Sequence, residues 1–146
     1  MKKFVIAFTI LASIVTTTTY ANDGVVTPEV LQSFQTTFAS AKNAGWSKTA
    51  DLYKVEFTLN GQPVTAFYKQ DGTMAAATRN LSFTQLPVAL QTDLKKEYSD
   101  FWITGLFELS NEEGVQYYIT VEDANNQVIL KSTSATWNLF QKQRKD

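Results

Sequence analysis

The dipeptide Asn60-Gly61 separates two runs of alternating apolar and polar residues, and this arrangement restricts the possible folds more than any other feature of the chain. Asn-Gly favours a two-residue type I′ turn, because both central residues of that turn need positive φ. A two-residue loop also fixes the register of the two strands. That register predicts three apolar pairs on one buried face: Tyr53 with Tyr68, Val55 with Ala66, and Phe57 with Val64.

A second turn dipeptide, Asp71-Gly72, follows the hairpin and leads into a third strand-like run at residues 73–79. The Asp71 carboxylate could in principle bind a cation, but a calcium loop needs several oxygen ligands at fixed spacing, and only one is present. Aspartate is also a common turn residue, because its side chain bonds to nearby backbone. We therefore interpret Asp71-Gly72 as the second turn of a three-strand meander.

Two amphipathic helices are predicted, one before each set of strands. Thr27, Pro28 and Glu29 form a helix start, with a capping residue, a proline at the first helical position and an acid that complements the helix dipole. The first apolar stripe comprises Val30, Phe34, Phe38 and Ala41, and Asn43-Ala44-Gly45 is the expected end. Leu86-Pro87 opens the second helix, whose stripe is Leu90, Leu94 and Tyr98.

The remaining chain predicts a second meander. Strand-like runs occupy residues 101–109, 115–122 and 128–132, with a polar loop at 110–114 and a turn at 123–126. The polar tail, residues 141–146, is expected to fray. The predicted fold class is α+β: a tandem repeat of helix-plus-β-meander units, about 25–83 and 84–134, forming one curved antiparallel sheet with two helices packed on one face.

Residues 1–21 have the pattern of a secretory signal peptide. Lys2 and Lys3 precede an apolar run at residues 4–15, and Thr19-Tyr20-Ala21 supplies small residues at the −3 and −1 positions of a cleavage site. No cysteine follows that could carry a lipid anchor. We therefore expect a single domain at residues 22–146, cut after Ala21, periplasmic or secreted, with no stable membrane anchor.

Charge and composition exclude several function classes. Residues 22–146 carry 11 basic and 14 acidic side chains, a net charge of −3, and no basic stripe, so nucleic acid is not an expected partner. The chain has no histidine and no cysteine. This removes Ser-His-Asp and Cys-His nucleophile systems and all metal sites built on those ligands. No cofactor and no metal site is predicted.

Other candidate catalytic groups have simpler explanations. Glu112 and Glu113 could form an acid pair of the kind glycosidases use, but adjacent residues on a strand point apart, so a solvated loop is the better interpretation. Tyr98 with Lys96, or Ser99 with Lys95, are ordinary surface positions of a helix. No catalytic residue is therefore assigned.

Outward-facing aromatics are the more informative signal. If Val55 and Ile119 face the helices, alternation directs Phe67 and Tyr118 to the other sheet face, and Trp102 alternates in the same way. Aromatics among polar residues are typical of recognition surfaces, so Phe67, Trp102 and Tyr118 are the candidate binding residues. Alternatively, they are singly exposed aromatics, or are covered by the C-terminal segment around Trp137 and Phe140. Trp46 and Trp137 themselves are expected core residues.

Taken together, these features resemble the secreted bacterial β-lactamase-inhibitor-like, PepSY-like family, over about residues 25–134. The matching positions are Pro28, Val30, Phe34, Phe38, Ala41, Trp46, Tyr53, Val55, Phe57, Gly61, Ala66, Tyr68, Gly72, Leu86, Pro87, Tyr98 and Tyr117. The resemblance implies the α+β fold described above. The family is related to true β-lactamase inhibitors through its fold, so the resemblance assigns no inhibited enzyme.

The predicted function is a non-enzymatic exported binding or inhibitory module that recognises a protein or peptide of the periplasm or envelope through its open sheet face. A small-ligand or cell-envelope binding protein is the alternative. A carboxylate-dependent hydrolase is a weaker one. The sequence leaves the oligomeric state open.

Overall fold

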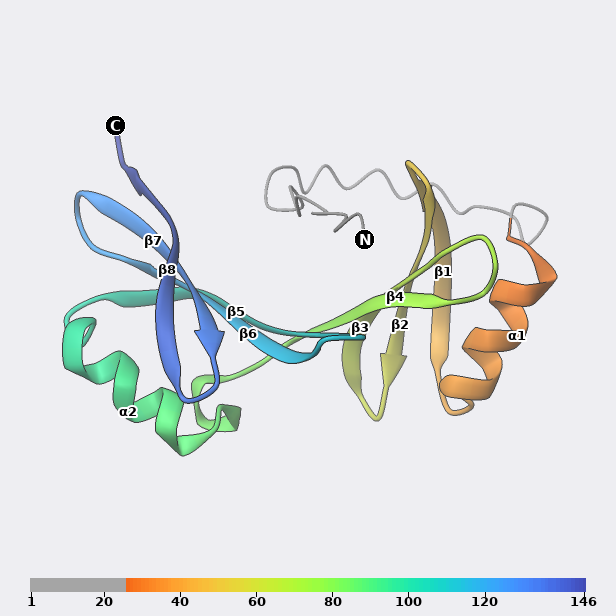
Figure 1. The fold of residues 1–146 in the computed structure, drawn as a ribbon, viewed down its shortest axis with the longest axis horizontal. Coiled ribbons are helices and arrows are strands. Elements are labelled where there is room, and N and C mark those ends of the chain that lie inside the picture. The colour runs from red at the N-terminus through yellow and green to blue at the C-terminus, as the bar shows by residue number, and fades with distance from the viewer. Residues whose placement is uncertain (1–25) are drawn as a thin grey trace, which may run out of the picture.

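A computed structural model describes residues 26–146 as one eight-stranded sheet with two α-helices (Figure 1). The strands follow one another across the sheet in chain order, and every neighbouring pair is antiparallel. Helix α1 precedes strands β1 to β4, and the 3₁₀ turn η2 and helix α2 precede strands β5 to β8. The bounds are α1 Pro28–Thr37, β1 Lys42–Thr49, β2 Leu52–Leu59, β3 Gln62–Tyr68, β4 Met74–Asn80, η2 Phe83–Gln85, α2 Val88–Glu97, β5 Trp102–Asn111, β6 Gly114–Glu122, β7 Asn126–Thr133 and β8 Thr136–Arg144.

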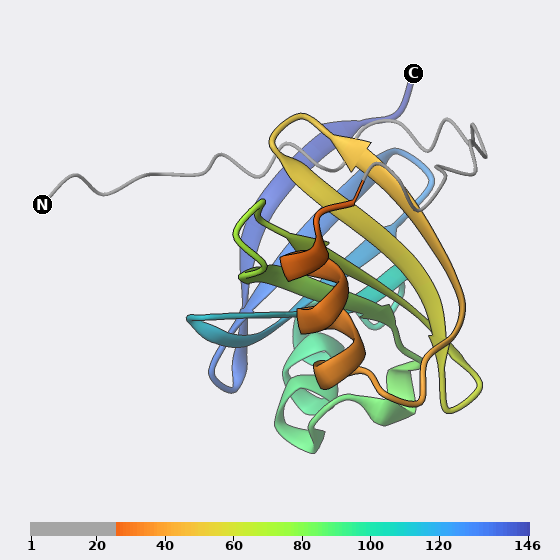
Figure 2. The same cartoon turned by 90° about the vertical axis from the view of Figure 1, so that its right-hand side faces the viewer.

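Both helices pack on the same face of the sheet. Ala66 and Ala77, which pair across β3 and β4, belong to the core under α1. Ala77 pairs with Ser110 on β5, and Ser110 faces the same side as Leu106, four residues away, which lies in the core under α2. The sheet is twisted and curved, and its last strand, β8, contacts α2 (Figures 1 and 2). The predicted α+β architecture, with one curved antiparallel sheet and both helices on one face, is therefore confirmed.

The core under α1 is rich in aromatic rings. Asn60 and Gly61 have φ values of 51° and 80°, as a type I′ turn requires, and all three predicted pairs across β2 and β3 are present. Val30 and Phe34 are buried against this hairpin, with Phe38 and Ala41 packed at the margin. The Phe34 ring meets those of Trp46, Phe57 and Tyr68 edge to face, with centroids 5.1 to 6.5 Å apart.

The core under α2 is mainly aliphatic. Leu90 and Leu94 are buried on α2, and Tyr98 packs at the margin, as the predicted stripe requires. Their partners on the sheet are the buried residues Leu106, Ile119, Val121, Val128 and Leu130. Trp137 on β8 packs against the same cluster, as expected of a core residue.

The prediction for residues 38–49 was wrong. Helix α1 ends at Thr37, with Phe38 as its C-cap, and β1 begins at Lys42. Asn43 adopts a left-handed φ of 56°, beside a break in the register between Lys42 and Gly45. Only Trp46 of this edge strand is buried, so β1 lacks the alternation that identifies a strand from its sequence.

The C-terminal prediction was also wrong. Residues 141–144 do not fray, because they belong to β8, which pairs with β7 along its whole length. The polar loop expected at 110–114 is shorter, with only Glu112 and Glu113 between β5 and β6. Strand β8 is polar and almost wholly exposed, so its pairing depends on backbone hydrogen bonds that leave no periodic pattern in the sequence.

Two expectations remain as they were. The predicted signal peptide, residues 1–21, lies outside the described residues, and the division into units of about 25–83 and 84–134 stays a prediction. The second helix is followed by strands as far as Arg144. Within residues 26–146, no helix is long and apolar enough to cross a membrane.

Candidate functional site

The sheet face opposite the helices, here called the uncovered face, carries all three candidate binding residues. Phe67 lies between Ala66 and Tyr68, both of which face α1, so Phe67 faces the other side. Tyr118 lies beside Ile119 of the α2 core and therefore also faces away from the helices. Trp102 pairs with Glu122, which shares the face of Tyr118 on β6. The predicted placement on one face is therefore correct.

Exposure divides the three residues. Trp102 is 64% exposed, whereas Phe67 and Tyr118 are only 8% and 9% exposed. The inference that outward orientation would leave them accessible was therefore wrong for Phe67 and Tyr118. These two rings form a second small core on the uncovered face with Ala76 and Leu109, flanked by Leu52, Ala75 and Phe107. The side chains of this cluster cover one another.

Aromatic rings extend this second core toward β8. The Phe107 and Tyr118 rings stack almost parallel, 5.1 Å apart, and Phe140 meets Tyr118 edge to face at 5.5 Å. The Lys131 ammonium lies 5.7 Å from the centre of the Tyr118 ring, within the range of a cation–π contact. Phe140 itself is 44% exposed. The alternative, cover by the C-terminal segment, applies to Tyr118, which Phe140 contacts, while Trp137 lies on the helix side.

At the other end of β5, Trp102 stands next to a network centred on Glu122. The Glu122 carboxylate accepts hydrogen bonds from the Thr104 hydroxyl at 2.9 Å and the Gln127 amide at 2.7 Å. The Lys145 ammonium lies 2.6 Å from its other oxygen. Hydrogen bonds from Lys145, Gln127 and Thr104 lower the pKa of Glu122 to about 2. This network ties the C-terminal end of the chain to β6.

The uncovered face holds few unpaired charges among the described residues. Lys54 pairs with Glu56 at 2.7 Å, and Glu122 pairs with Lys145. Amides and hydroxyls dominate between the aromatic side chains; by strand register they include Gln116, Thr120, Gln127, Asn138, Gln141 and Gln143. When most charges on an aromatic surface are already paired, few isolated ions lose their water on binding. The free-energy cost of desolvation is then small.

The other candidates form no catalytic or metal arrangement. Glu112 and Glu113 occupy the exposed turn between β5 and β6. Lys96 pairs with Asp93 at 3.1 Å, and the Lys95 ammonium lies 5.9 Å from the Phe83 ring. Within residues 26–146 no group of three or more carboxylates is placed to hold a metal ion.

The Asp71-Gly72 turn has a structural role. The Asp71 carboxylate accepts a hydrogen bond from the Thr73 N–H at 2.8 Å, and this bond is the main cause of a lowered Asp71 pKa. Gly72 has φ of 87° and packs against the start of α1, where an added Cβ would lie 2.8 Å from the Glu29 carbonyl oxygen. The Thr27 hydroxyl also donates to the Gln70 carbonyl at 3.1 Å. The turn interpretation of Asp71 is confirmed.

Phe107, Lys131 and Phe140 belong to the site but were not identified as binding residues from the sequence. A two-residue turn at Glu112 and Glu113 places Phe107 directly opposite Tyr118. The longer loop expected there concealed that register. Phe140 lies where the register between β7 and β8 shifts, and no periodic pattern in the sequence marks such a bulge.

Comparison with known proteins places this geometry among solved folds. No family model matches the chain, and no curated protein matches it. A BLIP-like protein of Bacteroides fragilis, whose name abbreviates β-lactamase-inhibitor protein, superposes with a TM-score of 0.72 at 16% identity, covering 82% of this chain and 86% of that one. A DUF2874 family protein of Bacteroides ovatus gives the same TM-score and identity, covering 82% and 87%.

A third similar structure comes from Bacteroides eggerthii and carries only a provisional assignment to the periplasm. It has 15% identity and a TM-score of 0.72, over 82% of this chain and 88% of that one. These identities are low, so the likeness is one of fold. The resemblance to β-lactamase-inhibitor-like proteins is therefore confirmed at the level of the fold, and the PepSY-like part of that resemblance stays a prediction.

Proposed function

We propose that the chain is an exported, non-enzymatic binding or inhibitory module that recognises a protein or peptide through the uncovered face. One observation carries this proposal: a sheet face without helix cover in the described residues presents Trp102 and Phe140 to solvent, 64% and 44% exposed. Large exposed aromatics on a well-ordered surface are the usual anchors of a protein interface.

Within this proposal the candidate residues have different roles. Trp102 and Phe140 are accessible and would contact the partner directly. Phe67 and Tyr118 are buried and would support the surface from below, with Tyr118 held between the Phe107 and Phe140 rings. Phe67 and Tyr118 each have a paired strand on both sides, which restrains the support beneath the accessible rings.

The fold and the sequence pattern support the cellular setting of the proposal. Similar folds occur in a BLIP-like protein and in a protein provisionally assigned to the periplasm. The signal-peptide pattern at residues 1–21 independently favours export. A periplasmic or envelope protein is therefore the proposed class of partner, and inhibition of an enzyme is one form that binding would take.

Affinity capture with residues 22–146 from a periplasmic extract, read by mass spectrometry, tests the proposal. The test variant is Trp102→Ala with Phe140→Ala. A matched control, Val88→Ala with Val115→Ala, removes two exposed aliphatic side chains that lie off the uncovered face. We expect a partner that wild type and control retain and that the test variant releases, with Kd raised about 30-fold or more if both residues are hot spots.

The remaining outcomes separate the alternatives. A partner that the folded test variant retains would contradict the proposed site. Absence of a protein partner, together with a ligand-dependent rise in melting temperature, would favour small-ligand or envelope binding on the same face. Turnover lost on changing one carboxylate to its amide would favour the hydrolase alternative.

A further inference from the structure

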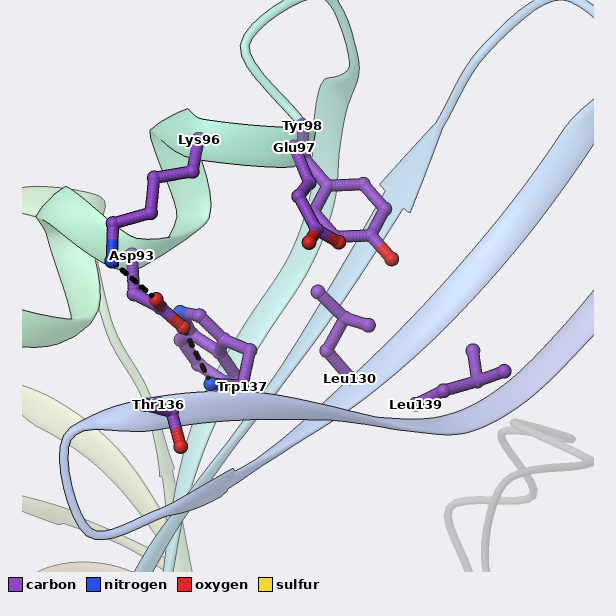
Figure 3. A pocket seen from close by; sticks show the side chains of 8 residues that line it. All are labelled: Asp93, Lys96, Glu97, Tyr98, Leu130, Thr136, Trp137 and Leu139. Carbon is purple, nitrogen blue, oxygen red and sulfur yellow. Dashed lines mark hydrogen bonds and ion pairs between the residues drawn. The ribbon is translucent and has the colours of Figure 1, made fainter.

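A pocket of about 280 Å³ opens on the helix side of the sheet, away from the uncovered face. It lies between the C-terminal half of α2 and strands β7 and β8 (Figure 3). Three side chains of α2 line it, namely Asp93, Lys96 and Glu97, with the C-cap residue Tyr98 and with Leu130, Thr136, Trp137 and Leu139 from the strands.

Trp137 gives the pocket a fixed wall. Its backbone N–H donates to the Asp93 carboxylate at 2.8 Å, and its indole N–H donates to the Leu90 carbonyl at 2.9 Å. The indole therefore has both a defined position and a defined orientation. The hydrogen bond from Trp137 is the main cause of a lowered Asp93 pKa, so this carboxylate is charged at neutral pH.

The charges of the pocket leave one carboxylate without an ion-pair partner. Asp93 and Lys96 neutralise each other at 3.1 Å. Glu97 makes no ion pair with any residue in the range 26–146. Glu97 is also the last residue of α2, where the negative end of the helix dipole favours a cation. The pocket is therefore negative at its Glu97 side.

The wall opposite Glu97 is apolar. Figure 3 shows Glu97 and Tyr98 leaving the end of α2 together, across from Leu130 and Leu139 on the strands. Leu139 is 62% exposed although it pairs with the buried Leu130, so the mouth of the pocket has an accessible apolar surface. The pocket therefore combines the Glu97 carboxylate, the Tyr98 ring and the apolar surface of Leu139. This combination is complementary to a cation carried on a hydrocarbon chain.

We propose that this pocket, formed by Glu97, Tyr98, Leu130, Trp137 and Leu139, binds a primary ammonium group on an unbranched carbon chain. The ammonium group pairs with the Glu97 carboxylate beside the Tyr98 ring, and the carbon chain lies along Leu130 and Leu139. The volume is just below the usual range for small-molecule sites, which suits a guest as small as a single side chain. A free alkyl amine and a lysine side chain of a partner share this chemistry.

Titration of the protein with three probes, followed through the indole N–H signals of its tryptophans by NMR, tests the inference. The probes are 1,5-diaminopentane, Nα-acetyl-lysine methylamide, and glutarate as a diacid of the same length. We expect a saturable shift of the Trp137 indole signal with at least one ammonium probe and none with glutarate. Binding of the diamine alone assigns a free amine, and binding of the lysine derivative assigns a side chain.

Two variants make the test specific. Glu97→Gln keeps the shape of the pocket and should weaken binding of the ammonium probe by about two- to fivefold, the effect of removing one exposed charge pair. Glu112→Gln removes an acid from the distant β5–β6 turn and should leave binding unchanged. Equal shifts with glutarate, binding unaffected by Glu97→Gln, or no saturable shift with either ammonium probe would overturn the inference.

Discussion

The two helix-led halves of the molecule share an arrangement but stabilise their helices by different means. Helix α1 lies on interlocking rings around Phe34, and its first turn contacts the Asp71-Gly72 turn between β3 and β4. Helix α2 lies on aliphatic side chains, and hydrogen bonds from Trp137 on the last strand hold its middle. The first half is thus held by close packing, and the second by directional bonds to an edge strand.

The two halves also differ in the pocket and the aromatic side chains that they expose. Beside the end of α2, a pocket opens next to Glu97. Both halves contribute to the uncovered face, but its accessible rings, Trp102 and Phe140, belong to the second half. The residues proposed to contact a partner therefore lie in the second half of the molecule.

The largest effect should come from truncating the ring at the centre of the α1 core. Phe34→Ala removes a buried ring that contacts four other aromatic rings, and should lower the free energy of unfolding by about 4 kcal/mol. Leu94→Ala, at the matching position of α2, should cost about 3 kcal/mol, because a smaller side chain is lost. Urea denaturation measures both. Equal or reversed costs would contradict the larger contribution assigned to the Phe34 ring.

The contact between α1 and the Asp71-Gly72 turn gives the next largest effect. Gly72→Ala places a Cβ 2.8 Å from the Glu29 carbonyl oxygen in a left-handed conformation, and should cost about 3 kcal/mol. Gly61→Ala is the matched control. It has a similar φ of 80° and no atom within 4 Å of the added Cβ, so only the backbone strain of about 1 kcal/mol should remain. Thermal unfolding of the two variants separates the cost of backbone strain from the cost of the steric clash. Similar losses of stability in both would contradict a close contact between Gly72 and Glu29.

On the α2 side, a single hydrogen bond should have a smaller effect. Trp137→Phe keeps an aromatic ring against the core but removes the indole N–H that donates to the Leu90 carbonyl, and should cost about 1 kcal/mol. Hydrogen exchange should show faster opening of α2 while α1 is unchanged. If the exchange of both helices accelerated equally, the two halves would unfold as one unit, and Trp137 would not stabilise α2 separately from α1.

The sequence predicted those parts of the fold that local chemistry determines. Asn60-Gly61 fixed one register, and the stripes through Phe34 and Leu94 located two helices. The edge strands β1 and β8 were missed, because an exposed edge strand is defined by its backbone pairing and carries no alternating pattern. The orientation of Phe67 and Tyr118 followed from alternation. Their burial could not be predicted from alternation, because it depends on contacts with Phe107 and Phe140 on other strands.

The smallest effect concerns pH. The Glu122 pKa falls from 4.5 to about 2 on folding, mainly through hydrogen bonds from Lys145 and Gln127. A lowered folded-state pKa means that this carboxylate stabilises the fold above about pH 4.5, and that the stabilisation is lost as the pH falls toward 2. Glu122→Gln should therefore flatten the fall in melting temperature across this window without abolishing it, because the pKa values of Asp71, Asp93 and Asp123 are also lowered.

Glu113→Gln is the control, since Glu113 lies in the exposed β5–β6 turn and forms no ion pair with the described residues. It should leave the acid slope as it is in wild type. The Glu122–Lys145 ion pair lies at the surface and is only partly buried, so added salt should reduce the difference between wild type and Glu122→Gln. A slope unchanged by Glu122→Gln at low salt would show that the Lys145 contact does not hold the end of β8 to β6 in solution. Phe140 would then lack one of the restraints that support its proposed place on the uncovered face.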